Sequence, residues 1–177
     1  MQVPPCGFHN AGSTMTDEMT AEERRQKITQ EIMLRTGITE AMISSVVRTF
    51  YDRIQHDPVL GPIFAEHIED WEPHLQRMEA FWSSITLMSG RYHGKPMAKH
   101  LPLPVHGAHF DRWLALFEDT AKSQCPEGAA AVFIERAHRV AESIELAMAG
   151  HHGILLAPGE RLTLPHLDAS VATPGTA

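Results

Sequence analysis

The apolar residues of this chain recur every three or four positions over most of its length, and this period is the strongest constraint on its fold. Between Thr39 and His56 the large side chains gather on one face of a helix. They are Ile43, Val46, Val47, Phe50, Tyr51 and Ile54. No stretch alternates apolar and polar residues for long enough to predict a strand. We therefore expect an all-α fold.

Capping residues, prolines and glycines divide the helical part of the chain into segments. Thr20 and Glu23 have the spacing of a capping box, and Asp70 can cap a helix that tolerates Pro73 in its first turn. The expected helices cover about 20–37, 39–56, 70–90, 107–122 and 127–149, with a short turn at 63–64 and one helical turn at 96–100.

The 177 residues are enough for one domain with its own core. We expect a loose N-terminal segment at 1–18, an extra N-terminal helix at 19–37, the main domain at 38–150 and a loose C-terminal tail at 151–177. Both end segments contain proline and glycine without a clear period.

Composition narrows the classes of function. The chain has 15 Lys and Arg against 22 Asp and Glu, a net charge of -7, and no basic run, so we do not expect it to bind nucleic acid. It has no apolar stretch of the length that a membrane helix needs, and no signal-peptide pattern at its start. Cys6 and Cys125 form no CxxC unit. We expect a cytoplasmic monomer that does not enter membranes.

Three polar side chains occur on inward helix faces, namely Tyr51, His74 and Trp113. A small helical protein can enclose a large cofactor when its wall is apolar and a few polar groups converge on the reactive atom. The apolar wall would come from Phe50, Phe64, Met78, Phe81, Ile85 and Phe117. Each polar group taken alone is more often an ordinary core or surface residue, and His100 alone could be a solvent-facing turn residue.

Five pieces of sequence, in their order along the chain, resemble the group III truncated haemoglobins of bacteria. The pieces are Phe50-Tyr51, Gly61-Pro62-Ile63-Phe64, Trp71-x-x-His74 with Phe81-Trp82, Tyr92-x-Gly94-x-Pro96-x-x-x-His100-Leu101, and Trp113-Leu114-x-Leu116-Phe117. The resemblance covers about residues 38–150, and the piece from Tyr92 to Leu101 is the most specific.

The resemblance implies a truncated globin, a two-over-two helical sandwich around haem b (iron protoporphyrin IX). His100 matches the proximal histidine that binds the iron, and its other ring nitrogen should donate to a carbonyl or similar acceptor. Tyr51, His74 and Trp113 match the distal positions that face a bound gas. His74 could also swing to open and close the pocket.

The remaining cofactor contacts follow from the same resemblance. Arg77, Tyr92 and Lys99 are candidates for the haem propionates, because charge-assisted hydrogen bonds hold carboxylates well. Solvated surface charge is an equally good reading of Arg77 and Lys99. The apolar residues expected to contact haem are Phe50, Phe64, Met78, Phe81 and Phe117.

The expected ligands are the gases O2, CO and NO, or peroxide. Strong distal donors should slow oxygen release, which suits oxygen activation, nitric oxide dioxygenation or peroxide cleavage better than transport. The sequence therefore does not determine whether the protein is an enzyme. The chain shows no reductase domain, so turnover would need an external electron donor that the sequence does not identify.

Two other classes stay open. A non-haem metal protein could use His106 and His109, three positions apart on one helix, or the single Glu135-x-x-His138 element, although di-iron bundles need two such elements. The other class is a helical interaction module without a cofactor, in which the aromatic and histidine groups are only core residues.

Overall fold

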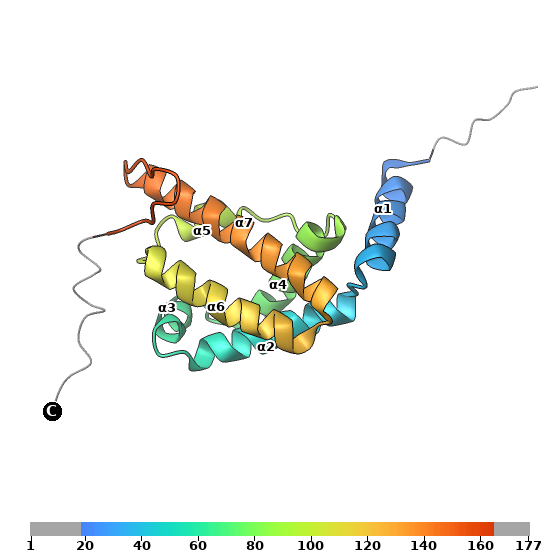
Figure 1. The fold of residues 1–177 in the computed structure, drawn as a ribbon, viewed down its shortest axis with the longest axis horizontal. Helices are drawn as coiled ribbons and strands as arrows, with labels where there is room; N and C mark the ends of the chain where they lie inside the picture. The colour runs from blue at the N-terminus through green and yellow to red at the C-terminus, as the bar shows by residue number, and fades with distance from the viewer. Residues whose placement is uncertain (1–18, 165–177) are drawn as a thin grey trace, which may run out of the picture.

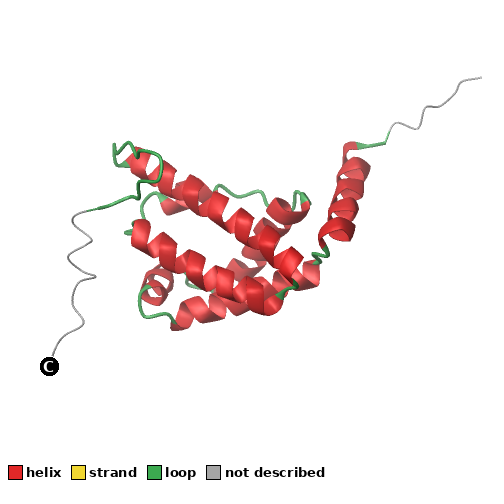
Figure 2. Ribbon diagram, in the orientation of Figure 1, coloured by secondary structure: helices red, strands yellow, loops and turns green. Residues whose placement is uncertain are grey.

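Seven α-helices form the described part of the chain, residues 19–164 of a computed structural model. They are α1 (Ala21–Thr36), α2 (Glu40–His56), α3 (Leu60–His67), α4 (Trp71–Leu87), α5 (Pro96–His100), α6 (Gly107–Gln124) and α7 (Glu127–His151). Within these residues no strand occurs (Figure 2). The all-α prediction is confirmed, and so is each of the five expected long helices.

Four helices build the body of the molecule. α6 packs along α7, α2 packs against both α4 and α6, and α4 also contacts α7, which places one helix pair over another (Figure 1). Aromatic rings fill the space between them. Trp82 of α4 stacks on Phe117 of α6 with ring centroids 4.5 Å apart, and Phe133 of α7 lies 6.0 Å from Trp82. All three rings are buried, and together with the buried face of α2 they form the core between the four helices.

α1 extends away from this body (Figure 1). It begins with the expected capping box, in which the Glu23 amide donates to the Thr20 hydroxyl and the Thr20 amide donates to the Glu23 carboxylate. It contacts α4 and α7 but has no buried residue, and Leu34 is 87% exposed. Gly37 ends it with φ of 71°, a left-handed conformation that glycine adopts without strain.

α3 is a helix where we expected only a short turn. The buried Asp57 carboxylate accepts hydrogen bonds from the amides of Val59 (3.0 Å) and Leu60 (2.9 Å), which holds the turn that leads into the helix. Gly61 lies so close to α2 that an added Cβ would be 2.9 Å from the Gln55 carbonyl oxygen. This close approach fixes α3 against the end of α2.

The expected bounds of two other helices differ slightly from the structure. α4 was expected to reach about Gly90, but it ends at Leu87 because Met88 adopts a left-handed conformation with φ of 58°. α7 extends to His151, two residues beyond the expected end. No helix within residues 19–164 combines the length and apolarity that a membrane-spanning segment needs.

The C-terminal segment differs from the expected loose tail as far as residue 164. Leu162 and Leu164 are buried, with 1% and 4% of their surface exposed, and Arg161 forms ion pairs with Glu145 and Asp111. The sequence pattern did not predict this packing because two alternating leucines are too short a signal. The expected loose segment 1–18 and the rest of the tail, 165–177, lie outside the described residues.

Candidate functional site

Tyr51 of α2 and His74 of α4 lie against each other. Their ring centroids are 4.9 Å apart at an interplanar angle of 86°, and Phe64 of α3 is 6.0 Å from Tyr51. Tyr51 is 5% exposed, and its burial raises the pKa of the phenol above its usual value. The hydroxyl is therefore a neutral hydrogen-bond donor at any physiological pH.

His74 has a buried ring nitrogen, Nε2, that has no hydrogen-bond partner among the described residues. Burial is the main cause that lowers the pKa of His74, to about 4, and the nearby charges of Arg77 and His100 lower it further. The imidazole is thus neutral near pH 7. A buried nitrogen without a partner is costly, and such a group points to a ligand at this position.

His100 ends the single turn of α5. Pro96 occupies the first position of that turn, and its carbonyl oxygen lies 2.8 Å from His100 Nδ1. A carbonyl oxygen can only accept, so Nδ1 carries the proton and the Nε2 lone pair is free to bind an electrophile such as a metal ion. This carbonyl is the partner that we expected for the second ring nitrogen without being able to identify it.

The Nδ1 bond alone does not distinguish His100 from other helix-end histidines. His67 makes the same bond to the Ile63 carbonyl at 2.8 Å, yet it lies exposed at the end of α3. His100 is half-buried, and it lies close enough to His74 that a positive charge on His100 would lower the pKa of His74. Its partial burial and its electrostatic effect on His74 therefore distinguish His100 from His67.

Trp113 reaches this region from α6. Its ring packs edge-on against Phe50 at 5.2 Å and stacks on Phe117 at 5.3 Å, with an interplanar angle of 8°. Phe50 also packs edge-on against Tyr51 at 5.1 Å. Phe50 and Phe117 are fully buried, whereas Trp113 is only half-buried. The structure thus brings Tyr51, His74 and Trp113 together around one aromatic cluster.

A second aromatic contact lies further along α4. Phe81 packs edge-on against Tyr92 with ring centroids 5.2 Å apart, and Met78, one turn earlier on α4, is partly buried against the core. Gly94 explains the Tyr92-x-Gly94 spacing, because a Cβ at this residue would overlap the Tyr92 hydroxyl. The tyrosine ring therefore lies over the Gly94 backbone.

Arg77 and Lys99 are exposed. No ion pair within residues 19–164 involves either side chain. The positive charge of Arg77 lowers the pKa of His74. Both cations are thus free to pair with an anion near the site. Exposed lysine and arginine side chains are also typical of an ordinary solvated surface. The structure is therefore compatible both with a propionate contact and with a solvated surface charge at Arg77 and Lys99.

Three residues that belong to the quoted sequence motifs were given no role in the site, and the structure now supplies one for each. Trp71 lies 5.9 Å from His74 and 6.1 Å from Tyr51, ring to ring, so it borders the same pair. Pro96 supplies the carbonyl for His100, and Gly94 supplies the space for Tyr92. The spacing of Pro96 and His100, four residues on one helical turn, is a signal that could have identified that partner.

The metal sites that we kept open find no support in the described residues. Glu135 pairs with Arg139, and His138 pairs with Glu118 on α6, so the two residues of the Glu135-x-x-His138 element have separate partners. No group of three or more His, Cys, Asp or Glu side chains in residues 19–164 is arranged to hold a metal ion.

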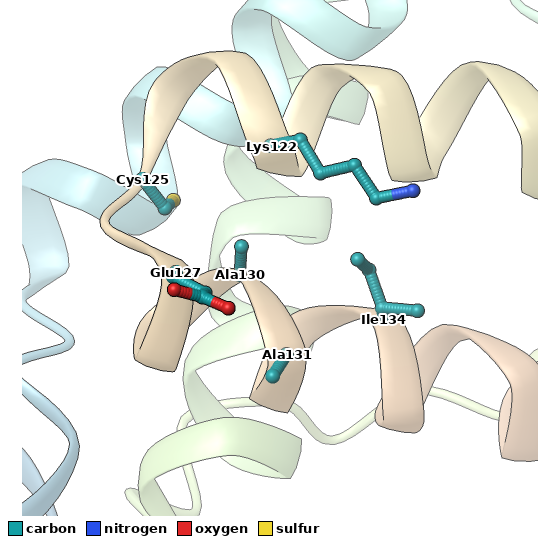
Figure 3. A pocket seen from close by; sticks show the side chains of 6 residues that line it. All are labelled: Lys122, Cys125, Glu127, Ala130, Ala131 and Ile134. Atoms are coloured by element: carbon teal, nitrogen blue, oxygen red, sulfur yellow. The ribbon is translucent and has the colours of Figure 1, made fainter.

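An open hollow lies at the corner between α6 and α7 (Figure 3). It is lined by Lys122, Cys125, Glu127, Ala130, Ala131 and Ile134. Burial raises the pKa of the Cys125 thiol, which makes it a poor nucleophile at neutral pH. None of the residues predicted for the functional site lines this hollow, so it is separate from the Tyr51–His74 region.

Comparison with known protein families shows to which family the chain belongs. The model of the family described as "Bacterial-like globin" matches residues 35–146, which is most of the described chain and includes every residue of the candidate site. The chain belongs to the bacterial-like globin family. Globins bind haem and small gaseous ligands such as O2, so this globin is a haem-binding protein.

The similar sequences and the similar structure that were found are truncated hemoglobins. Group 3 truncated hemoglobin ctb of Campylobacter jejuni is 33% identical over 113 residues, covering 61% of this chain and 89% of the relative. Group 2 truncated hemoglobin YjbI of Bacillus subtilis is 31% identical over 85 residues, covering 47% and 64%. The crystal structure of a group III truncated hemoglobin from Campylobacter jejuni matches with a TM-score of 0.58 and 33% identity, over 60% of this chain and 88% of that one. The truncated globin fold and the resemblance to group III are confirmed.

The residues of this globin fit a haem. His74 on α4 has a buried Nε2 without a hydrogen-bond partner among the described residues, and the Nδ1 contact of His100 at the end of α5 leaves its Nε2 lone pair for a metal ion. The half-buried side chains of Phe64, Phe81 and Trp113 pack against the core and supply further apolar surface. Imidazole is a common iron ligand in haem proteins, so this donor set has the chemistry that the family requires.

Proposed function

We propose that His100 is the proximal ligand to the iron of haem b. The observation that supports this most directly is the 2.8 Å contact between His100 Nδ1 and the Pro96 carbonyl oxygen. That bond fixes the tautomer and the ring orientation, and it makes Nε2 a stronger base toward a metal. The haem would supply an iron with one open position for a small ligand.

The opposite side of the haem would face Tyr51, His74 and Trp113. A buried phenol and an indole N–H donate hydrogen bonds strongly in a dry pocket, because water does not compete there. His74 is neutral and half-buried, so it can donate from one nitrogen or move aside. We expect O2, CO and NO to bind here, with slow release of oxygen, and peroxide to reach the same side.

The haem propionates would lie near Arg77, Tyr92 and Lys99. The two exposed cations offer charge-assisted hydrogen bonds, and the Tyr92 hydroxyl offers a neutral one. Phe50, Phe64, Met78, Phe81 and Phe117 would form the apolar wall around the ring. A wall of this kind keeps water from the iron, which strengthens each polar contact that remains.

Slow oxygen release favours reaction over transport. We propose nitric oxide dioxygenation or peroxide cleavage in the cytoplasm by a monomer, with electrons from an external donor. Assays that follow nitrate formation from NO by the oxygenated protein, and peroxide consumption by the ferric protein, separate these two activities. Failure of both with rapid oxygen release would favour a carrier.

Replacement of His100 by glycine tests the ligation. We expect His100→Gly to lose the iron–histidine band in the resonance Raman spectrum of the ferrous protein and to regain a similar band when imidazole is added. His67→Gly is the matched control, since His67 makes the same Nδ1 contact to a carbonyl but lies exposed on α3. An unchanged band in His100→Gly would refute the assignment, and a pyridine haemochrome spectrum identifies haem b.

A further inference from the structure

We infer that Arg161 is a positioning residue for His100, acting through the residue at which the loop after His100 enters α6. That residue is Gly107, the first of α6. The inference rests on the proposed ligation of iron by His100. Arg161 lies beyond residues 35–146 that the family model matches, so its role is a property of this chain and not of the family pattern.

Arg161 neutralises a buried carboxylate. Its Nε donates to both oxygens of Glu145, at 3.0 and 2.9 Å, and the Glu145 side chain is only 7% exposed. The Leu162 amide also donates to Glu145, at 2.7 Å. Glu145 thus accepts three hydrogen bonds from two consecutive residues of the C-terminal segment. A buried carboxylate without such partners would be strongly unfavourable.

The same segment holds both backbone groups of Gly107. Arg161 Nη2 donates to the Gly107 carbonyl at 3.0 Å, and the Gly107 amide donates to the Leu162 carbonyl at 2.8 Å. The contact is close, because a Cβ on Gly107 would be 2.8 Å from Arg161 Cβ. Arg161 also pairs with Asp111, one turn further along α6. The first turn of α6 is therefore fixed to α7 by one guanidinium group.

A short hydrogen-bonded loop connects this anchored turn to His100. The Leu103 amide donates to the His100 carbonyl at 3.0 Å, and the Val105 amide donates to the Leu103 carbonyl at 2.9 Å. Val105 is buried, so the loop cannot move freely at that point. Only six residues separate His100 from Gly107. A shift of Gly107 would consequently be transmitted to the end of α5, which carries the imidazole.

The buried leucines explain why the segment is able to act as an anchor. Leu162 and Leu164 flank Thr163 and are 1% and 4% exposed, so apolar burial adds to the ion pair in holding the segment in place. Arg161 is thus held on one side by packing and on the other by three acceptors, Glu145, Asp111 and the Gly107 carbonyl.

A neutral double variant, Arg161→Gln with Glu145→Gln, tests the inference in the haem-loaded full chain. It removes the guanidinium without leaving a buried charge behind. We expect the iron–histidine band of the ferrous protein to shift and broaden, because the imidazole samples more orientations. We also expect haem to dissociate to an acceptor apoglobin about 10-fold faster, as is typical when an outer contact of a metal ligand is lost.

The matched control is Arg139→Gln with Glu135→Gln, which removes an exposed Arg–Glu pair from the same helix, α7. We expect its band and its rate of haem loss to equal those of the wild type. An unchanged band in the double variant at Arg161 and Glu145, or an equal shift in the control, would overturn the inference even if stability falls.

Arg161→Lys is a second test of the positioning role of Arg161, to be used if the double variant does not fold. Lysine keeps a positive charge beside Glu145, but one ammonium group is unable to bridge both that carboxylate and the Gly107 carbonyl as the guanidinium does. A shifted band supports the inference, and an unchanged band refutes it. Absence of any iron–histidine band in the wild type would instead refute ligation by His100, so the two failures are distinguishable.

Discussion

Asp57 at the end of α2 forms a forked ion pair with Arg112 on α6, and Arg112 directly precedes Trp113. Arg112 Nε lies 2.7 and 2.8 Å from the two Asp57 oxygens, and the Asp57 side chain is 4% exposed. Asp57 Oδ1 also accepts from the first amides of α3. One carboxylate thus joins α2, α3 and α6 beside the aromatic cluster that holds Tyr51 and Trp113.

Loss of this carboxylate should destabilise the fold. We expect Asp57→Ala to lower the free energy of unfolding by about 2 kcal/mol, since it removes the acceptor of two backbone amides and the partner of a half-exposed arginine. Urea denaturation measures the change. Asp52→Ala is the control, because Asp52 lies on the same helix and is 73% exposed. Equal effects of the two substitutions would contradict the role assigned to Asp57.

The Tyr51 hydroxyl should slow the release of oxygen. We expect Tyr51→Phe to speed oxygen dissociation about 10-fold, the effect of losing one hydrogen bond in a dry site. Stopped-flow displacement of O2 by CO measures the rate. Asp52→Ala, at a 73% exposed residue that neighbours Tyr51 on α2, is the control and should leave the rate nearly unaltered. Trp113→Phe, alone and combined with Tyr51→Phe, shows by double-mutant cycle whether both donors act on one ligand.

Stability should depend on pH through His74. Its folded pKa of about 4 lies below the ordinary 6.5, so the unfolded chain binds a proton that the folded chain does not between these values. The stabilisation is therefore complete above about pH 6.5 and is lost as pH falls toward 4. We expect the stability difference between the wild type and His74→Gln to shrink over that interval in urea titrations. A difference that does not vary with pH would show that His74 is not buried in its neutral form.

Stability should fall when one methyl group is added beside the Tyr92 ring. Gly94→Ala places a Cβ where the Tyr92 hydroxyl lies, so the ring must move away from Phe81. We expect a destabilisation of about 1–3 kcal/mol, the usual cost of overpacking, measured by thermal unfolding. Gly128→Ala adds the same atom in α7, where no other group lies within 4 Å, and should be neutral or slightly stabilising.

The sequence predicted those features of the fold that depend on local order. The period of apolar residues gave the helices of residues 39–56 and 107–122 nearly as they occur, and the Thr20–Glu23 spacing gave the first cap. It missed α3 as a helix, because the Asp57 carboxylate that accepts the amides at its start is kept in place by Arg112, 55 residues away. A local pattern does not contain that partner.

The residues of the candidate site were predicted from the sequence, but several contacts between them were not. Tyr51, His74, His100 and Trp113 were found from the sequence because helix periodicity turned three of them inward and the family pattern identified the fourth. The contact of Trp71 with both Tyr51 and His74 was not predicted, since it depends on how α2 and α4 cross. The electrostatic effect of His100 on His74 likewise depends on how α4 and α5 lie relative to each other, which no local spacing encodes.

The sequence by itself determined that this chain is helical, which faces of the helices are apolar, and which histidines and aromatic residues belong to a globin pattern. Only the tertiary structure decided which carbonyl orients His100, which nitrogen of His74 is left without a partner, and that residues 161–164 pack on α6 and α7. The reason is physical. Helix period and capping act within a few residues, whereas buried ion pairs and ring contacts depend on packing between segments distant in the chain.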